Sequence, residues 1–397
     1  MGSQRTSEAS VPPLVDILAD IPDFRQAQGR RHPLVAILTL ASVAMLCGYR
    51  SPSAIAEWGH NYTGSWLYLF GFRDGKAPSP STMQRVFRGL DVAQLEQRLT
   101  GWAENVLQLL EPHSQTDLEG VAVDGKSLRG SRRHGAQGVH LLSAVSHRLG
   151  VVLGQVAVDD KTNEITAMQD LLAQLALRGR LITGDALLTQ QEISRAIIRH
   201  GGDYLLAVKH NQPTLLRGIQ DLFFTADTAP NLLADSIKTT KEIRLRAGHL
   251  EERVVEASTA LQGYALQGYS NWPGIQQVLR IKRSVTNKRT GHASCEIAYA
   301  VTSLPCQRAT PEQLLKAWRG HWTIENKVHW VRDVTFDEDR QQLRAGHAHQ
   351  VLAALRNTAI GLLRLHGETN IARACRRYAA QPLLAAHAVG LFHPSRE

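Results

Sequence analysis

Val121-Ala122-Val123-Asp124-Gly125-Lys126 is a short apolar β-type run that ends in a carboxylate and a glycine. Leu181-Ile182-Thr183-Gly184-Asp185-Ala186 has the same form further along the chain. An Asp after a strand is most often a turn former, because its side chain bonds nearby backbone N–H groups. If the two strands are neighbours in one sheet, however, both carboxylates emerge at one place and repel each other unless a cation lies between them. Magnesium, a hard ion bound by oxygen ligands, suits such a position.

The segments around these two runs predict a mixed sheet with helices. His140 to Val145 and Val151 to Val158 have the character of strands, and Asn163 can cap a helix whose apolar positions reach Leu175. Gln190 to His200 predicts a second helix, and Tyr204 to Val208 predicts another strand. Three strands, a helix, a strand, a helix and a strand in this order indicate an α/β layer.

Residues 1–115 predict helices only. The apolar run from Pro33 to Cys47 is shorter than the roughly 20 residues that a membrane span needs, so it predicts a buried helix. Ser51 and the serines around Pro80 are helix-start signals, and a longer helix is expected from Val92 to Leu110.

The short helix that begins near Pro80 carries Arg85 and Arg88 on one side. Such a helix could be the reader of a helix-turn-helix domain, or its arginines could be solvated side chains on a plain helical bundle. Both interpretations stay open from the residues alone.

Residues 235–304 again have a period of two. Ile243 and Leu245 alternate with Arg244 and Arg246, and Leu279 and Ile281 alternate with Arg280 and Lys282. Since successive side chains of a strand point to opposite faces, we expect the apolar pairs to face inward and the basic pairs outward.

Pro311 is expected to open a long helix that runs to about Val334. Four groups along it are spaced by four residues and are expected on one face: His321, Glu325, His329 and Asp333. They could be a ladder of metal ligands or a partly solvated polar stripe. The tryptophans of this helix, Trp318, Trp322 and Trp330, predict that one of its sides is buried, so that the charged side faces a site.

The composition favours a polyanionic partner. The 397 residues carry 45 Lys and Arg against 36 Asp and Glu, a formal charge of +9. Residues 1–115 hold ten basic and ten acidic side chains, so the surplus lies in the remainder, including the arginine-rich last 50 or so residues. The four cysteines form no C-x-x-C pair, which argues against a zinc ribbon or a disulfide scaffold.

Several long strings, in order along nearly the whole chain, resemble the DDE-type transposases of bacterial insertion sequences, in the H-repeat-associated (ISAs-type) branch. They are IPDFRQAQGRRHPL at Ile21–Leu34, AVDGKSLRGS at Ala122–Ser131, KTNEI at Lys161–Ile165, TGDALLTQ at Thr183–Gln190, GGDYLLAVKHNQP at Gly201–Pro213 and HWTIENKVHWVRDVTFDED at His321–Asp339. The resemblance implies a ribonuclease-H-like α/β core with a mixed sheet. This core would comprise residues 116–234 and 305–345, with a β-rich insertion at 235–304, an N-terminal helical domain at 1–115 that is a candidate for DNA binding, and a C-terminal helical segment at 346–397.

By this resemblance Asp124, Asp185 and Glu325 match the acidic triad of the family, which binds metal and is catalytic. Two Mg2+ ions, for which Mn2+ can substitute, would serve an in-line phosphoryl transfer, with Asp124 bridging both. The stretch Ala247–Arg253 departs from the family's usual His-Gly-Arg-x-Glu-x-Arg pattern at Ala247 and His249. A Tyr-Arg-Glu-Lys signature of a neighbouring group maps only loosely, with His321 at its Arg and Arg332 at its Lys.

Basic and amide side chains near the triad in sequence are expected to contact DNA, mostly through phosphates. They are Lys126, Arg129, Lys209, Asn211, Gln212, Arg319, His321, Asn326, Lys327 and Arg332. Trp322 and Trp330 could stack on a flipped base, but packing into the core is the preferred expectation.

The expected function is therefore metal-dependent cleavage and strand transfer at the ends of an insertion sequence. The expected partners are double-stranded DNA, as terminal inverted repeats and target, and a second copy of the chain, with no membrane. The expected location is the bacterial cytoplasm and nucleoid. The alternatives are a domesticated DNA-binding protein without catalysis, a metal-dependent nuclease that joins no strands and, more distantly, a zinc or di-iron enzyme built on the His321–Asp333 groups.

Overall fold

The computed structural model describes residues 11–62, 64–110, 118–132, 138–158, 164–262 and 272–392. The chain forms two compact units. Unit 1 comprises Met1–Asp117, Gly125–Thr162 and Ile324–Glu397, and unit 2 comprises Leu118–Asp124 and Asn163–Thr323. The chain passes from unit 2 into unit 1 inside a single strand, between Asp124 and Gly125.

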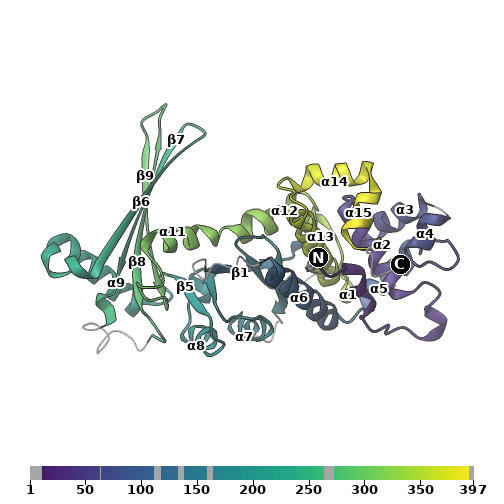
Figure 1. The fold of residues 1–397 in the computed structure, drawn as a ribbon, viewed down its shortest axis with the longest axis horizontal. Helices are drawn as coiled ribbons and strands as arrows, with labels where there is room; N and C mark the ends of the chain where they lie inside the picture. The colour runs from purple at the N-terminus through teal and green to yellow at the C-terminus, as the bar shows by residue number, and fades with distance from the viewer. Residues whose placement is uncertain are drawn as a thin grey trace, which may run out of the picture. The chain divides into compact units, whose positions relative to one another are not determined.

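Unit 1 is mainly helical (Figure 1). The α-helices of its described residues are α1 (Leu14–Ala19), α2 (Leu34–Leu46), α3 (Pro52–His60), α4 (Ser65–Leu69), α5 (Pro80–Gly89), α6 (Val92–Leu109), α12 (Trp330–Val334), α13 (Ala348–Leu365), α14 (Ile371–Ala380) and α15 (Pro382–Ala388). Helix α2 is buried along almost its whole length and packs against α1, α3, α13, α14 and α15, as its apolar sequence predicts. No helix among the described residues is long and apolar enough to cross a membrane.

Side-chain caps explain where several helices of unit 1 begin. The Ser51 hydroxyl accepts a hydrogen bond from the Ala54 N–H at the start of α3, and Ser79 accepts one from Thr82 at the start of α5. Both starts and the long helix α6 confirm the sequence prediction. Helix α4 was not predicted. It is short, and Leu67 is its one buried side chain.

Both predicted strands of unit 1 are present, as β2 (His140–Ser146) and β3 (Val152–Val158), and they pair antiparallel as a hairpin. Gly150 makes the turn with a φ of 66°, a conformation that glycine adopts without strain. Helices α6 and α13 pack on β3, so the hairpin is covered by helices that come from both ends of the chain.

Unit 2 contains the parallel part of the sheet. Strand β4 (Arg180–Gly184) lies between β1 (Glu119–Ser127) and β5 (Asp203–Val208) and is parallel to both. The helices α7 (Glu164–Gln174) and α8 (Gln191–Arg199) lie side by side, as Figure 1 shows. The proposed cap of α7, Asn163, lies outside the described residues.

The described strands form one sheet in the order β3-β2-β1-β4-β5-β9-β8-β7-β6. Antiparallel strands followed by parallel strands and crossover helices confirm the predicted mixed-sheet, ribonuclease-H-like α/β fold with helical N- and C-terminal regions. The β-rich segment does not form a sheet of its own, because its last strand β9 (Ala293–Thr302) pairs antiparallel with β5.

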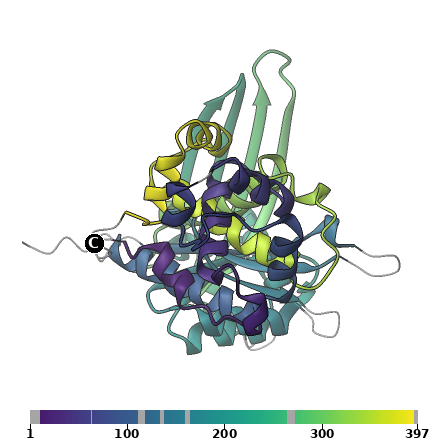
Figure 2. The ribbon, with the colours of Figure 1, turned by 90° about the vertical axis from the view of Figure 1, so that its right-hand side faces the viewer.

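Three further long strands complete this antiparallel half of the sheet: β6 (Ile237–Arg246), β7 (His249–Ser258) and β8 (Gln277–Asn287). Figure 2 shows the hairpins β6–β7 and β8–β9 projecting side by side. The departure from the family pattern falls at the β6–β7 turn, where Ala247 and Gly248 both have positive φ. A two-residue turn of this kind requires positive φ at both positions, which Gly248 provides without strain.

The predicted facing of the alternating strands was wrong in two places. In β6, Ile243 and Leu245 are 55% and 62% exposed, because the end of this strand extends past the helices that cover the sheet. Arg280 is buried rather than outward, because helix α9 (Pro213–Thr228) lies on that face of β8. Its guanidinium pairs with Asp227 and Glu256 and lies over the Phe223 ring. Helix α9 itself was not predicted.

The expected single helix after Pro311 is interrupted. Helix α11 (Pro311–Gly320) ends in a turn at His321, and the segment η7 (Glu325–His329) forms a π-helical turn before α12. A π turn adds a residue to the helical repeat, so the regular spacing of the predicted helix is interrupted. Glu325 and His329 nevertheless remain neighbours, with 3.2 Å between the carboxylate and the His329 Nδ1, so this pair of the predicted polar stripe is formed.

Candidate functional site

Asp124 and Asp185 are brought together within unit 2 by the register of β1 and β4. Val123 is the partner of Gly184 in this parallel pair, and each is followed directly by one of the two aspartates. Neighbouring strands lie about 5 Å apart, so the two carboxylates leave adjacent strands at the same level. The two strands are thus neighbours, which is the condition for both carboxylates to emerge at one place, although β1 continues to Ser127 and Asp124 lies within it rather than after it.

The backbone directly after β4 fixes the direction of Asp185. Its carboxylate Oδ1 accepts a hydrogen bond from the Leu187 N–H at 2.9 Å, which caps the short helical turn η3 (Ala186–Leu188). The carboxylate is thus held by its own loop and remains partly accessible.

Asn211 and Gln212, expected as DNA contacts, hold this same loop from the end of β5. The Asn211 side-chain amide donates to the Ala186 carbonyl, and the Gln212 amide donates to the Thr189 carbonyl at 2.9 Å. The Thr189 hydroxyl in turn donates to the carbonyl of Ala207 in β5. No pattern of residues indicates this role of Thr189 in advance. Together these bonds tie the Asp185 loop to the neighbouring strand.

The other candidates of unit 2 differ in exposure. Lys209 is exposed just beyond β5. Arg319 is committed to an ion pair with Glu242 of β6, with 2.7 Å between its Nη1 and the carboxylate. The Nδ1 atom of His321 lies 3.3 Å from the Thr183 hydroxyl of β4. Trp322 is 53% exposed, so the preferred expectation that it packs into the core was wrong.

Glu325 lies in the π turn of unit 1 and is paired with His329. The His329 Nδ1 lies 3.2 Å from the Glu325 carboxylate, and the imidazole is almost completely buried. This hydrogen bond holds the pKa of Glu325 below its usual value, against a smaller opposite effect of burial, and the positive charge of Lys126 adds to the lowering. Glu325 is therefore kept ionised, as a metal ligand must be.

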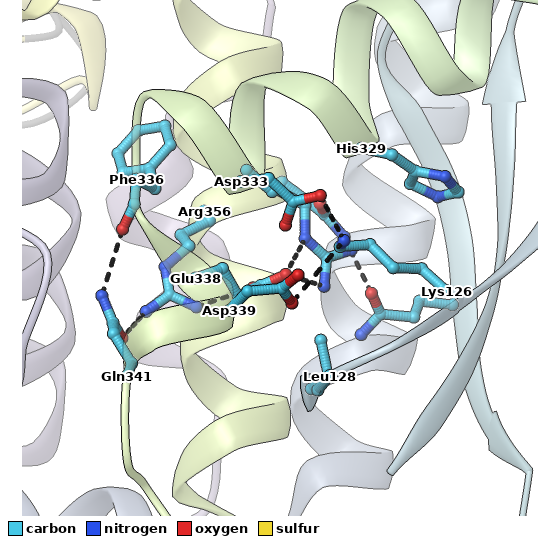
Figure 3. Close-up of polar contacts among 12 residues, drawn as sticks. Lys126, Leu128, His329, Asp333, Phe336, Glu338, Asp339, Gln341 and Arg356 are labelled. Atoms are coloured by element: carbon cyan, nitrogen blue, oxygen red, sulfur yellow. Dashed lines mark hydrogen bonds and ion pairs between the residues drawn. The ribbon is translucent and has the colours of Figure 1, made fainter. Parts of the chain in front are cut away.

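Lys126 reaches from β1 toward the acidic side chains that follow the π turn, as Figure 3 shows. Its Nζ atom lies 2.6 Å from the Asp333 carboxylate and 4.0 Å from that of Asp339, and its side chain is only 9% exposed. Arg129 lies 3.5 Å from Asp339 but is largely exposed. Of these two predicted DNA contacts, Arg129 presents its charge to solvent and Lys126 is mostly covered.

A buried ion-pair network lies beneath this region (Figure 3). The Glu338 carboxylate forms ion pairs with the Arg332 Nη2 at 2.8 Å and with the Arg356 Nη1 at 2.7 Å. All three side chains are almost completely excluded from solvent. Burial raises the pKa of Glu338, but the two guanidinium charges outweigh it and hold the pKa at about 2. Arg356 also donates to the Gln341 side chain, so the network joins α12, the segment after it and α13.

This network changes the interpretation of two arginines. Arg332, expected to contact DNA, is fully buried and serves as a counter-charge to Glu338. Arg356, part of the arginine-rich C-terminal segment, is likewise inside. Charge counting could not separate these buried arginines from exposed ones.

The remaining candidates lie along the π turn and α12. Asn326 is exposed, and Lys327 is partly covered, with its ammonium 3.4 Å from the His147 carbonyl. Trp330 is 55% exposed, which again contradicts the expectation of a core position.

The chain matches known families along most of its length. The family described as DDE_Tnp_1-associated matches residues 15–103, and the family described as Transposase DDE domain matches residues 115–362. The chain is 33% identical over 361 residues to "Putative transposase YncI" of Escherichia coli O157:H7, covering 89% of this chain and 88% of that protein. It is 30% identical over 361 residues to "H repeat-associated putative transposase YhhI" of Escherichia coli K12, covering 88% and 90%.

One solved structure is also similar. It is described as "Cryo-EM structure of piggyBac transposase synaptic complex with hairpin DNA", and the similarity has a TM-score of 0.41 at 11% identity, covering 98% of this chain and 84% of that one.

Proposed function

The chain belongs to the Transposase DDE domain family, in its H-repeat-associated branch, and is an enzyme of this type; on that premise we propose that it cuts DNA at the ends of its own insertion sequence and joins the freed ends to target DNA. The single observation that carries the proposal is the register of β1 and β4, which sets Asp124 and Asp185 at one level on adjacent strands.

We propose Glu325 as the third acidic group of this site. Asp124 and Lys126 are two residues apart on β1, and because side chains alternate along a strand, they lie on the same face. The charge of Lys126 contributes to the lowered pKa of Glu325. Glu325 also stands at the third acidic position of the family's motif, which supports this assignment.

Membership of the family implies dependence on a divalent metal. The proposed ligands fit a hard cation, because all three are carboxylates and the hydrogen bond from His329 keeps Glu325 ionised. We propose that Asp124, Asp185 and Glu325 would hold two Mg2+ ions, which Mn2+ could replace. Such ions, when bound, would stabilise the charge on both the attacking and the leaving oxygen of the phosphoryl transfer.

The protein's own side chains would position the DNA. Arg129, Lys209 and Asn326 are exposed, and we assign to them contacts with phosphates and sugars around the carboxylates. Lys126, Lys327, Arg319 and His321 are committed to protein partners and would contact DNA only by exchanging those partners. Asn211 and Gln212 would act as positioning residues for Asp185, and Arg332 would support the π turn from within.

The exposed indoles Trp322 and Trp330 are available for stacking on unpaired bases at a cut end. We further propose that the partner is double-stranded DNA, both the terminal inverted repeats and the target. Two copies of the chain would act together on paired ends, in the cytoplasm at the nucleoid. We also propose the division of the chain into a helical domain, a catalytic core, a β-rich insertion and a helical segment. Their residues are 1–115, 116–234 with 305–345, 235–304 and 346–397, respectively.

A strand-transfer assay tests the proposal. The substrate is a labelled duplex that ends in the inverted repeats found beside the gene, incubated with the full chain, a target plasmid and Mg2+. We expect cut ends and joined products, both lost in Asp124→Ala. A protein that releases ends and joins none would be a nuclease, and normal joining by Asp124→Ala would refute the assignment of the site.

A further inference from the structure

A groove of about 690 Å3 lies among the N-terminal helices of unit 1 (α3, α4 and α5 in Figure 1). It lies between the segment around Arg25, the end of α3 and the first turns of α5. Its described lining contains no carboxylate but includes the cationic side chains of Arg25, Arg31, Lys76 and Arg85. The N-terminal region has equal numbers of acidic and basic side chains overall, so this concentration of cations is local.

Arg25 is built into the wall of the groove. Its Nε and Nη2 atoms each donate to the Asp23 carboxylate at 2.8 Å, and Nη2 also donates to the His32 carbonyl at 2.8 Å. The side chain is only 9% exposed. Its other terminal nitrogen, Nη1, is buried and has no hydrogen-bond partner in the part of the chain that the structure describes. Its protein neighbours thus leave one donor of Arg25 unmatched, at a cost of about 1–3 kcal/mol.

The first turn of α5 gives the groove a second anion-binding element. Ser79 caps this ten-residue helix, and the hydroxyls of Ser79, Ser81 and Thr82 gather at its start. These hydroxyls and the helix dipole make such an end favourable for negative charge. Arg85, one turn later, is exposed and bonds only to Thr82 and the Ser81 carbonyl, without a carboxylate partner among the described residues.

Two cations of the lining already have a counter-charge. Arg25 pairs with Asp23, and the Nε atom of Arg31 lies 3.3 Å from the Asp74 carboxylate. Lys76 is exposed in the same wall and makes no ion pair within the described residues. The other end of α5 is covered, because the Arg88 carbonyl accepts a hydrogen bond from the His347 N–H. The open end of α5 is thus the end that faces the groove.

We propose that this groove binds backbone phosphates of duplex DNA, as a second DNA site apart from the catalytic carboxylates. Its volume far exceeds that of one phosphate, and its cations are spread over three chain segments, which suits successive phosphates of a strand. In this assignment α5 is held against the backbone by its N-terminal end rather than laid along a groove of DNA as a reader. The inference rests on the proposed function, because it takes DNA as the partner.

The test compares two double variants of the full chain. Lys76→Ala/Arg85→Ala removes two exposed cations of the groove, and Arg73→Ala/Arg98→Ala removes two exposed cations of the same region that do not line it. Fluorescence anisotropy gives Kd for the terminal-repeat duplex from 50 to 300 mM salt. Each lost phosphate contact reduces the slope of log K against log salt by about 0.9. We expect the groove variant to bind at least tenfold more weakly and with a slope smaller by about two, and the control variant to match the wild type.

Equal Kd values and slopes for the groove and control variants would overturn the inference, while normal strand transfer by the wild type would leave the proposed function intact. A wild type that binds no duplex at all would overturn both. Titration of the wild type with inorganic phosphate separates the sources of the ligand. Tight phosphate binding together with unchanged DNA affinity of the groove variant would identify a site for a small anion and refute the DNA assignment.

Discussion

Replacing Glu338 by Gln should strongly destabilise unit 1. The carboxylate lies between the guanidinium groups of Arg332 and Arg356, at 2.8 and 2.7 Å, and all three side chains are buried. The amide of Gln keeps the size of the side chain but removes its charge. Two buried cations would then face each other without a counter-charge.

Two estimates of the loss agree. A fall of the Glu338 pKa from 4.5 to about 2 corresponds to about 3 kcal/mol in favour of the folded state at neutral pH. Removing one partner of a buried ion pair costs about 3–5 kcal/mol. Because the pKa is lowered on folding, the contribution is present above about pH 4.5 and is lost as the pH falls toward 2.

Urea unfolding followed by tryptophan fluorescence measures the effect, with Glu57→Gln on the exposed side of α3 as the matched control. We expect Glu338→Gln to lower the free energy of unfolding by about 3 kcal/mol at pH 7 and by much less at pH 3. The triple change Arg332→Met/Glu338→Leu/Arg356→Met should recover most of the loss, because apolar side chains can replace a buried ionic triad. A loss no larger than that of the control would refute the reasoning.

Three further outcomes are expected. Burial raises the pKa of Glu96 to about 7, so its ionisation favours unfolding as the pH rises from 4.5 to 7. Glu96→Gln should therefore stabilise the chain by about 2–3 kcal/mol at pH 8 and change its stability little at pH 4. Equal urea-unfolding midpoints of this variant and the wild type at pH 8 would count against this. Arg280→Met should cost about 3 kcal/mol and speed hydrogen exchange in β8, since Glu256, whose carboxylate is largely covered, loses its closest partner; unchanged exchange would contradict it. Asn211→Ala should lower the rate of strand transfer about fivefold without changing DNA affinity, and an unchanged rate would argue against its role in positioning Asp185.

The sequence predicted what depends on local patterns. The apolar run of α2, the caps Ser51 and Ser79 and the two strands that lead to Asp124 and Asp185 are all found as expected. Each of these signals is set by propensity, capping or alternation within a few residues.

The errors arose where a distant segment decides. Arg280 alternates correctly with its apolar neighbours, but alternation does not reveal that α9 covers its face and supplies Asp227. Arg332 has the charge expected of a DNA contact, yet Glu338 and α13 enclose it. The π turn at Glu325 likewise has no signature in residue spacing, and it interrupts the single regular helix that the sequence predicted.

The central claim, that Asp124 binds the catalytic metal, is tested most directly by Asp124→Cys in the strand-transfer assay with Mg2+ and with Mn2+. Thiolate is a softer ligand than carboxylate, so it binds Mg2+ poorly and Mn2+ better. The wild type should join strands with either ion. The variant should be inactive with Mg2+ and recover with Mn2+, while its affinity for the terminal-repeat duplex stays unchanged. Normal joining by Asp124→Cys in Mg2+, or equal loss with both ions, would contradict the assignment of Asp124 as a metal ligand.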